Sequence, residues 1–292
     1  MKNRWLVPLV LAFGVLAQGA MAQRNQVFPR DIHGLWWQPT DPGWATVVFD
    51  QQTKMSKALL LYDRDGVPIW FFTRKLDCST NHSAYLQIDC SGTMELITGP
   101  WFGEPTFRPD RVAFNPIGDW NGTFQTPLFG GNGPDVRRTL YASYTIEGTT
   151  FLQAGDMPLV AEVVDPEDRF LYLNTSQSGL WGNPNELGWY IGFAQQGTRL
   201  VATLLVHDRD GRPRWYVMYA KGPAYGGNPE SLFEGGVFET RGHPYFSRSA
   251  DRFQVRRVGD VRVKFGATSA DGASLYYSID GVEVSKNIIR LP

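Results

Sequence analysis

The chain has 292 residues, with 28 Lys and Arg against 29 Asp and Glu and a formal net charge of -1. This balance argues against a nucleic-acid-binding surface or an anionic membrane surface, because both need clustered basic residues. Its 31 glycines, 19 prolines and 14% aromatic residues, with no long helical period after the first segment, predict an all-β chain.

Residues 1–22 have the pattern of a secretory signal peptide. Lys2 and Arg4 precede an uncharged, mostly apolar run at 5–17, and Ala-Met-Ala at 20–22 supplies a small-residue cleavage site. The apolar run is shorter than the roughly 20 residues that a membrane-spanning helix needs. We therefore expect a mature chain from Gln23, with no membrane span, exported to the periplasm or the cell exterior.

The chain repeats itself after this segment. Residues 34–70 return as residues 179–215 with a constant offset of 145 and 16 identities in 37 positions. Both copies carry Gly-x-Trp-x-x-Pro, then Gly-Trp, then Asp-x-Asp-Gly-x-Pro-x-Trp. Self-similarity at this level indicates a duplicated structural unit. We expect a first β repeat at 23–160, a linker at 161–176 and a second β repeat at 177–292.

Each repeat predicts an antiparallel meander. Strands are expected at 34–39, 43–50, 57–62 and 67–73, and in the second copy at 189–195, 199–206 and 212–220. The Asp and Gly residues at 63–66 are typical of a tight hairpin turn. With seven or eight strands, each repeat predicts a small barrel or sandwich. Apolar residues occupy both faces of the strand at 212–220, so we expect both faces of the sheet to be covered, with the other repeat as a candidate cover.

Two cysteines, Cys78 and Cys90, lie close together in the first copy and have no counterparts in the second. In an oxidising compartment they predict a disulfide that closes a short loop. The alternative is a zinc site with His82 as a third ligand, but a closed structural site needs a fourth. We expect the disulfide, and no metal or other cofactor.

The repeated motif resembles a secreted proteobacterial family of tandem β repeats with no assigned activity. The run Lys-Asn-Ile-Ile-Arg at 286–290 is also similar to the ends of those repeats, whereas the first copy has Gln153-Ala154-Gly155 there. The resemblance implies an exported repeat protein and brings no mechanism. The opening Gly-x-Trp before a meander is also similar in architecture to avidin-like and lipocalin-like barrels.

Six tryptophans recur as matched pairs and are the candidate ligand-binding residues. Indole rings can stack on sugars or enclose a small apolar ligand at a barrel mouth, but they also fill cores. Packing is the favoured interpretation, since core residues must repeat in a duplicated fold. The six are Trp36, Trp44, Trp70, Trp181, Trp189 and Trp215.

Paired aspartates also recur, at 63 and 65 and at 208 and 210. They could serve as calcium ligands or as an acid/base pair, but turn formation explains both Asp and Gly. Asp119 and Asp260 recur as well, each after a glycine. No nucleophile elbow, zinc-protease motif, P-loop or dinucleotide fingerprint is present, so no catalytic residue is assigned.

The leading hypothesis is an exported, non-enzymatic binding protein for an unknown small molecule, glycan or protein. Its ligand would meet the aromatic end of one repeat or the groove between repeats. A structural protein of the cell envelope or surface is the alternative, and a hydrolase that uses the repeated aspartates is a further one. If the copies have specialised, function is expected where their sequences differ.

Overall fold

The computed structural model describes residues 34–38, 41–50, 55–82, 85–127, 138–157, 177–196, 199–222, 232–247, 253–266 and 272–291. The expected signal peptide and linker lie outside these residues. The described chain consists of β-strands, one 3-10 turn at Pro109–Arg111 and irregular connections. The all-β class expected from the sequence is confirmed.

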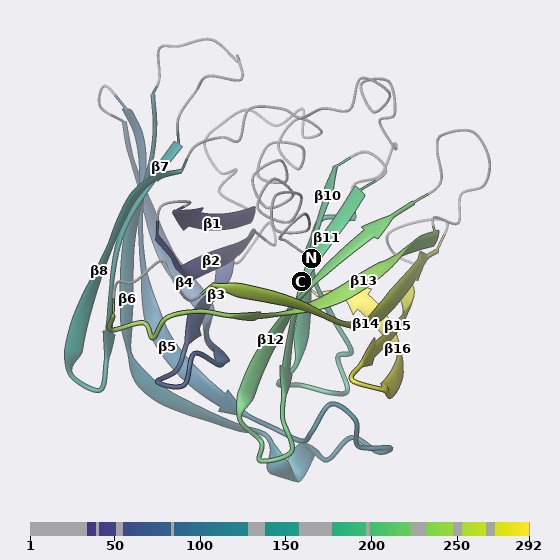
Figure 1. Ribbon diagram of the computed structural model, residues 1–292. Coiled ribbons are helices and arrows are strands. Elements are labelled where there is room, and N and C mark those ends of the chain that lie inside the picture. The colour runs from purple at the N-terminus through teal and green to yellow at the C-terminus, as the bar shows by residue number, and fades with distance from the viewer. Residues whose placement is uncertain are drawn as a thin grey trace.

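The first copy forms an antiparallel sheet that curves into a half-barrel, and each strand pairs with the next one in the chain (Figure 1). No ladder joins its first and last strands within the described residues, so the sheet keeps two edges. The strands are β1 (Gly34–Gln38), β2 (Asp41–Asp50), β3 (Met55–Tyr62), β4 (Pro68–His82), β5 (Tyr85–Thr98), β6 (Ala113–Pro127), β7 (Arg138–Ile146) and β8 (Thr149–Met157).

The second copy repeats this order and closes into a barrel. Closure comes from the last strand, where Ile289 pairs with Gly182 and Arg290 with Trp181 in the first strand. The strands are β9 (Gly179–Gly182), β10 (Tyr190–Gln196), β11 (Arg199–His207), β12 (Pro213–Lys221), β13 (Leu232–Arg241), β14 (Gln254–Phe265), β15 (Ala273–Ile279) and β16 (Val282–Arg290). The two predicted meanders of seven or eight strands are therefore confirmed as one half-barrel and one barrel.

The strand limits follow the prediction closely except in β4. This strand was expected to end at Thr73 but continues to His82, across a register shift between Phe72 and Asp77. The extra length pairs Cys78 directly with Cys90 of β5. The two cysteines that the second copy lacks thus lie on a longer hairpin arm of the first copy.

The hairpin between β3 and β4 depends on its first aspartate and its glycine. Asp63 Oδ1 accepts hydrogen bonds from the backbone N–H groups of Asp65 and Val67, both at 2.9 Å. Gly66 has φ of 72°, a left-handed conformation that glycine adopts without a Cβ clash. The second copy builds the same turn with Asp208 and with Gly211 at φ of 77°.

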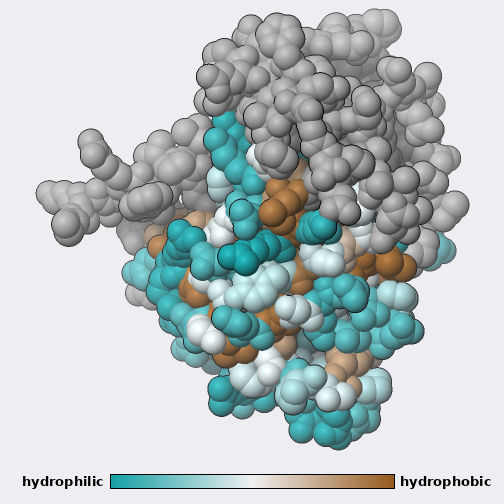
Figure 2. Space-filling model, turned by 90° about the vertical axis from the view of Figure 1, so that its right-hand side faces the viewer, coloured by the Kyte–Doolittle hydropathy of each residue, from teal (hydrophilic) through white to brown (hydrophobic). Residues whose placement is uncertain are grey.

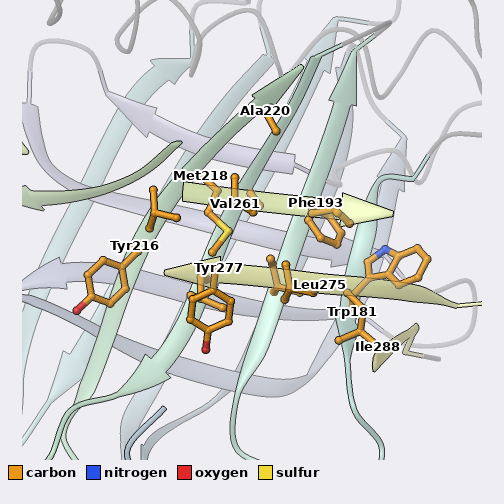
Figure 3. Close-up of a cluster of buried hydrophobic side chains, with 14 of the residues drawn as sticks. Trp181, Phe193, Tyr216, Met218, Ala220, Val261, Leu275, Tyr277 and Ile288 are labelled. Carbon is orange, nitrogen blue, oxygen red and sulfur yellow. The ribbon is translucent and has the colours of Figure 1, made fainter. Parts of the chain in front are cut away.

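Buried side chains form three clusters. One fills the closed barrel, where Trp181, Phe193, Tyr216 and Tyr277 point inward (Figure 3). A second covers the concave face of the first sheet, and the third lies between the two copies and draws residues from both. Both faces of β4 and β12 are therefore covered, as the apolar residues on both faces of the strand at 212–220 predicted.

The copies contact each other through reciprocal interactions of equivalent residues. Trp70 Nε1 in β4 donates to the Val206 carbonyl, and Trp215 Nε1 in β12 donates to the Leu61 carbonyl, each at 3.1 Å. These two equivalent hydrogen bonds, one from each copy to the other, indicate that the copies are related by a pseudo-two-fold axis.

Two connecting segments extend this exchange. The first arm (residues 99–112) follows β5 and reaches the barrel, and the second arm (residues 242–247) follows β13 and reaches the first sheet (Figure 1). Gly99 N–H donates to the Gly211 carbonyl, and Gly242 N–H donates to the Gly66 carbonyl, both at 3.3 Å. Each repeated turn thus receives the arm of the other copy.

Figure 2 shows one face of the molecule, on which the described residues are mostly hydrophilic. On the face shown in Figure 2, hydrophobic residues appear in small separate areas between polar ones. Scattered apolar residues of this kind are normal on a folded surface.

Candidate functional site

All six repeated tryptophans are buried. Trp36 and Trp44 pack on the concave face of the first sheet, Trp181 and Trp189 pack inside the barrel, and the remaining pair lies between the copies. The most exposed of them, Trp44, retains 9% of its surface. This burial favours the packing interpretation, and ligand stacking on these rings stays a prediction.

The repeated aspartates serve the hairpin turns described above. Their second members, Asp65 and Asp210, are exposed at the turn tips. Asp208 also forms an ion pair with Arg214 at 2.6 Å. These contacts favour the turn interpretation over an acid/base pair.

Asp119 lies beside an open polar groove on the outer face of β4, β5 and β6, with a volume of about 600 Å³. Arg74 also lines it, but its guanidinium is bound by both oxygens of Glu95. That contact raises the pKa of Arg74 above its usual value. Asp119 itself accepts a hydrogen bond from Thr93 at 3.4 Å. Lys75 of the groove likewise pairs with Asp77 at 2.7 Å, so both of its basic groups have an acidic partner.

Cys78 and Cys90 form the expected disulfide. Both sulfurs are used in that bond, so the alternative zinc site with His82 is wrong. In the described part of the chain, no group of three or more His, Cys, Asp or Glu side chains is placed to hold a metal ion.

The tail residues found only in the second copy have structural contacts. Lys286 Nζ forms an ion pair with Glu186 at 2.7 Å, and Glu186 also accepts from Trp189 Nε1 at 3.0 Å. The Arg290 guanidinium lies 5.4 Å from the centre of the Trp181 ring. This run therefore supports the closing strand of the barrel.

Aromatic residues close one end of the barrel. Phe102 and Phe107 of the first arm pack against the barrel core, beside Trp189 and Tyr277. The cavity left between them measures about 30 Å³. Since one water needs about 10–15 Å³ on this scale, the cavity is far smaller than a ligand site.

The concave face of the first sheet carries a different arrangement, which we call the polar layer. Its members are buried, and their polar side-chain atoms have no hydrogen-bond partner among the described residues. Leaving such an atom unpaired costs about 1–3 kcal/mol. The polar layer consists of Thr46, Lys57, Thr73, Trp120 and Gln153.

Strand register brings the members of the polar layer together. Lys57 of β3 lies opposite Thr73 of β4, and the Lys57 Nζ sits 4.5 Å from the centre of the Trp120 ring. Between Thr73 and Trp120 lies Gly92 of β5, where an added Cβ would come within 2.5 Å of Thr73 Cγ2. The glycine thus leaves room for its two neighbours.

The amine of Lys57 is the most costly group of the polar layer. Its side chain is fully buried, and burial lowers its pKa well below the usual value of 10.5 because the charged form loses its hydration. Gln153 of β8 leaves both ends of its amide unpaired. Such groups in a dry interior are frequent at functional sites, where an incoming molecule satisfies them.

The second copy has apolar residues at four of the five equivalent positions. Thr46, Lys57 and Thr73 correspond to buried Ile191, Ala202 and Met218 at the offset of 145, and Trp120 corresponds to buried Val261. Gln153 corresponds to Lys286, which has its partner in Glu186. The polar layer is therefore a property of the first copy alone.

The sequence contains an indication of this site, although none of the known motifs points to it. A buried strand position that is apolar in one copy and polar in the other marks a place where the copies differ in their interior. Thr46, Lys57 and Thr73 satisfy that test within the aligned repeats. The six tryptophans, in contrast, are what the copies share.

Comparison with known proteins finds no matching family model, no similar curated protein and no similar solved structure. Within the described residues, no helix has the length and apolar character needed to cross a bilayer. The functional argument consequently depends on the geometry of the chain itself.

Proposed function

We propose that this chain is an exported, non-enzymatic binding protein in which the two copies have specialised. The closed barrel acts as a scaffold, and the concave face of the half-barrel holds a small ligand. The observation that carries this proposal is the polar layer, whose orphaned atoms are absent from the equivalent layer of the second copy.

The loss of folding stability that the unpaired atoms of the polar layer cause is the first argument for a bound ligand. Buried apolar residues occupy four of the five equivalent positions in the second copy, so the fold does not require polar residues there. Polar atoms that weaken an interior are retained where a bound molecule pairs with them. A partner for the amine, the hydroxyls, the indole N–H and the amide would restore the lost hydrogen bonds.

Access to the concave face is the second support. The barrel is closed by pairing of β16 with β9, whereas β8 and β1 form no ladder within the described residues. Gln153 belongs to β8, and the partly buried Phe151 lies on the same face two residues earlier. Because no ladder joins β8 to β1 within the described residues, this side of the half-barrel is the proposed entry for the ligand.

The test replaces the polar layer by apolar groups of similar shape, with the combined substitutions Thr46→Val, Lys57→Met and Thr73→Val. Thermal shift and tryptophan fluorescence of the mature protein are measured against glycans, lipids and small amphiphiles. We expect one class to raise the Tm of the native protein by mass action and to leave the variant unaffected. Without ligand, the variant should be more stable by about 1 kcal/mol or more.

A matched control changes similar residues on the outer face, with Thr93→Val and Lys75→Met. Both residues are exposed, so these substitutions should alter neither binding nor stability. A native protein that responds to no class, or a triple variant that still binds the ligand, overturns the proposal.

A structural role in the envelope is the second candidate, and the burial of all six repeated tryptophans favours it. In that case the first and second arms would hold the two repeats of one chain in a fixed arrangement, and this rigid chain would assemble with others. Sedimentation of the mature protein tests this role. A strictly monomeric protein that binds a ligand excludes it, whereas ligand-independent assembly by the triple variant supports it.

A further inference from the structure

The polar layer is rich in hydrogen-bond donors. The Trp120 N–H can only donate, the Lys57 amine donates two or three protons, and the hydroxyls of Thr46 and Thr73 can rotate to donate. The complementary group on a ligand must accept several hydrogen bonds at one point. A carboxylate, with two oxygens and about four lone-pair sites, does so in the least volume.

The layer also lacks a negative charge. Among the side chains whose burial is described, Glu95 is the only buried acidic one. Glu95 lies beside Met94 of the concave cluster and so points to the opposite face, where both of its oxygens bind Arg74. Lys57 Nζ has no hydrogen-bond partner among the described residues, so a ligand that accepts a hydrogen bond would supply one.

The surroundings of the layer are apolar. Leu59 and Phe71 flank Lys57 and Thr73 on the same face, and Trp36 packs edge-on against Phe124 at 5.0 Å. Met55, two residues before Lys57, is an apolar side chain that is only partly buried. These groups suit a hydrocarbon body and offer it no further polar contact.

Resting on the function proposed above, we propose that the ligand is an amphiphilic monocarboxylate. Its carboxylate accepts hydrogen bonds from Lys57 and Trp120, and its apolar body lies along the concave face of the first sheet. A cationic ligand would offer these donors no acceptor, and a neutral alcohol would leave most of them unpaired. A carboxylate hydrogen-bonded to an amine is also stronger than a neutral contact.

The experiment compares three ligands with the same tail: decanoate, decanol and decyltrimethylammonium, each below its micelle concentration. Isothermal titration calorimetry and tryptophan fluorescence measure their binding to the mature protein. We expect decanoate to bind once per chain, about tenfold or more tightly than decanol, because a hydrogen bond to a charged group contributes more than a neutral one. The ammonium compound should bind most weakly.

Two variants locate the carboxylate. Lys57→Met should weaken decanoate binding about tenfold or more and leave decanol binding unchanged. Trp120→Phe keeps an aromatic ring but removes its N–H, and should weaken decanoate binding by about three- to tenfold. Lys75→Met is the matched control, since Lys75 is exposed and paired with Asp77, and should leave all three affinities unchanged.

The outcomes separate this inference from the function on which it rests. If all three ligands bind equally, or if Lys57→Met keeps the preference for decanoate, the carboxylate inference is wrong and the binding site stands. If none of the three binds, the carboxylate inference is overturned as well. The wider panel and the triple variant then decide whether the concave face binds any ligand.

Discussion

His207 is a buried histidine at the position that Tyr62 occupies in the first copy. Its Nε2 lies 3.0 Å from the Ile97 carbonyl and, since a carbonyl only accepts, carries the proton. The ring lies against Gly99 of the first arm, where an added Cβ would come within 2.6 Å of Nδ1. Tyr62 makes the equivalent contact with its hydroxyl, which donates to Thr240 at 3.0 Å.

Burial lowers the pKa of His207 from 6.5 to about 4, because the imidazolium would lose its hydration. Between these values the unfolded chain binds a proton that the folded chain does not, so this group lowers stability as pH falls from 6.5 to 4. The loss should reach about 3 kcal/mol and level off below pH 4. Urea unfolding at pH 7, 6, 5 and 4 measures it.

The variant His207→Gln keeps a side-chain N–H for the Ile97 carbonyl and does not titrate. It should flatten the pH dependence of stability across this range relative to the native protein. An unchanged slope in the variant would show that other groups cause the acid sensitivity.

Lys57 illustrates what a single residue position reveals about the candidate site. As a residue type it predicts an exposed strand position, and only the alignment with Ala202 places it on a buried face. The tryptophans are easier to notice, yet their repetition reflects core packing. A comparison of the two copies in the sequence could therefore have identified the positions of the polar layer. It could not have shown that their polar atoms lack hydrogen-bond partners, because that depends on the neighbouring strands.

At the scale of strands, the meander was predictable because its information is local. Turn residues at 63–66 and 208–211 set the hairpins, and apolar runs between them set the strands. Closure was not predictable, because it depends on pairing between β9 and β16, which are distant in sequence. The tail difference at Gln153-Ala154-Gly155 lies in the copy whose first and last strands form no ladder within the described residues.

The disulfide joins directly opposed residues of β4 and β5 beyond the register shift in β4. Replacing it with Cys78→Ser and Cys90→Ala suits the exposure of the first residue and the burial of the second. We expect the free energy of unfolding to fall by about 3 kcal/mol, since an open loop has more conformational entropy in the unfolded chain. Urea unfolding of the native and double-variant proteins measures the loss.

Reductant provides an independent check of the same prediction. Added to the native protein, it should lower the Tm toward that of the double variant, and it should not affect the variant itself. Equal stability of the native and double-variant proteins would mean that strand pairing alone fixes this hairpin.

At the scale of the whole molecule, the two copies share one interface cluster. Leu60 and Trp70 from the first copy and Leu205 and Trp215 from the second pack in it. The two arms add backbone hydrogen bonds across the same interface. The packing of one copy on the other explains why both faces of the strand at 212–220 are covered, as predicted. The sequence did not indicate that each repeated turn binds the arm of the other copy.

Shared burial predicts that the copies unfold together. Trp215→Phe removes the indole N–H that reaches the Leu61 carbonyl and leaves that buried acceptor unpaired, which should cost about 1–3 kcal/mol. Because Leu61 belongs to the first copy, hydrogen exchange should accelerate in β5 and β6 of that copy as well as in the barrel that carries the substitution. Leu152→Ala, at an exposed position of β8, is the control and should leave exchange unchanged. Faster exchange confined to the second copy would show that each copy is stable alone and that the reciprocal contacts join two independently folded units.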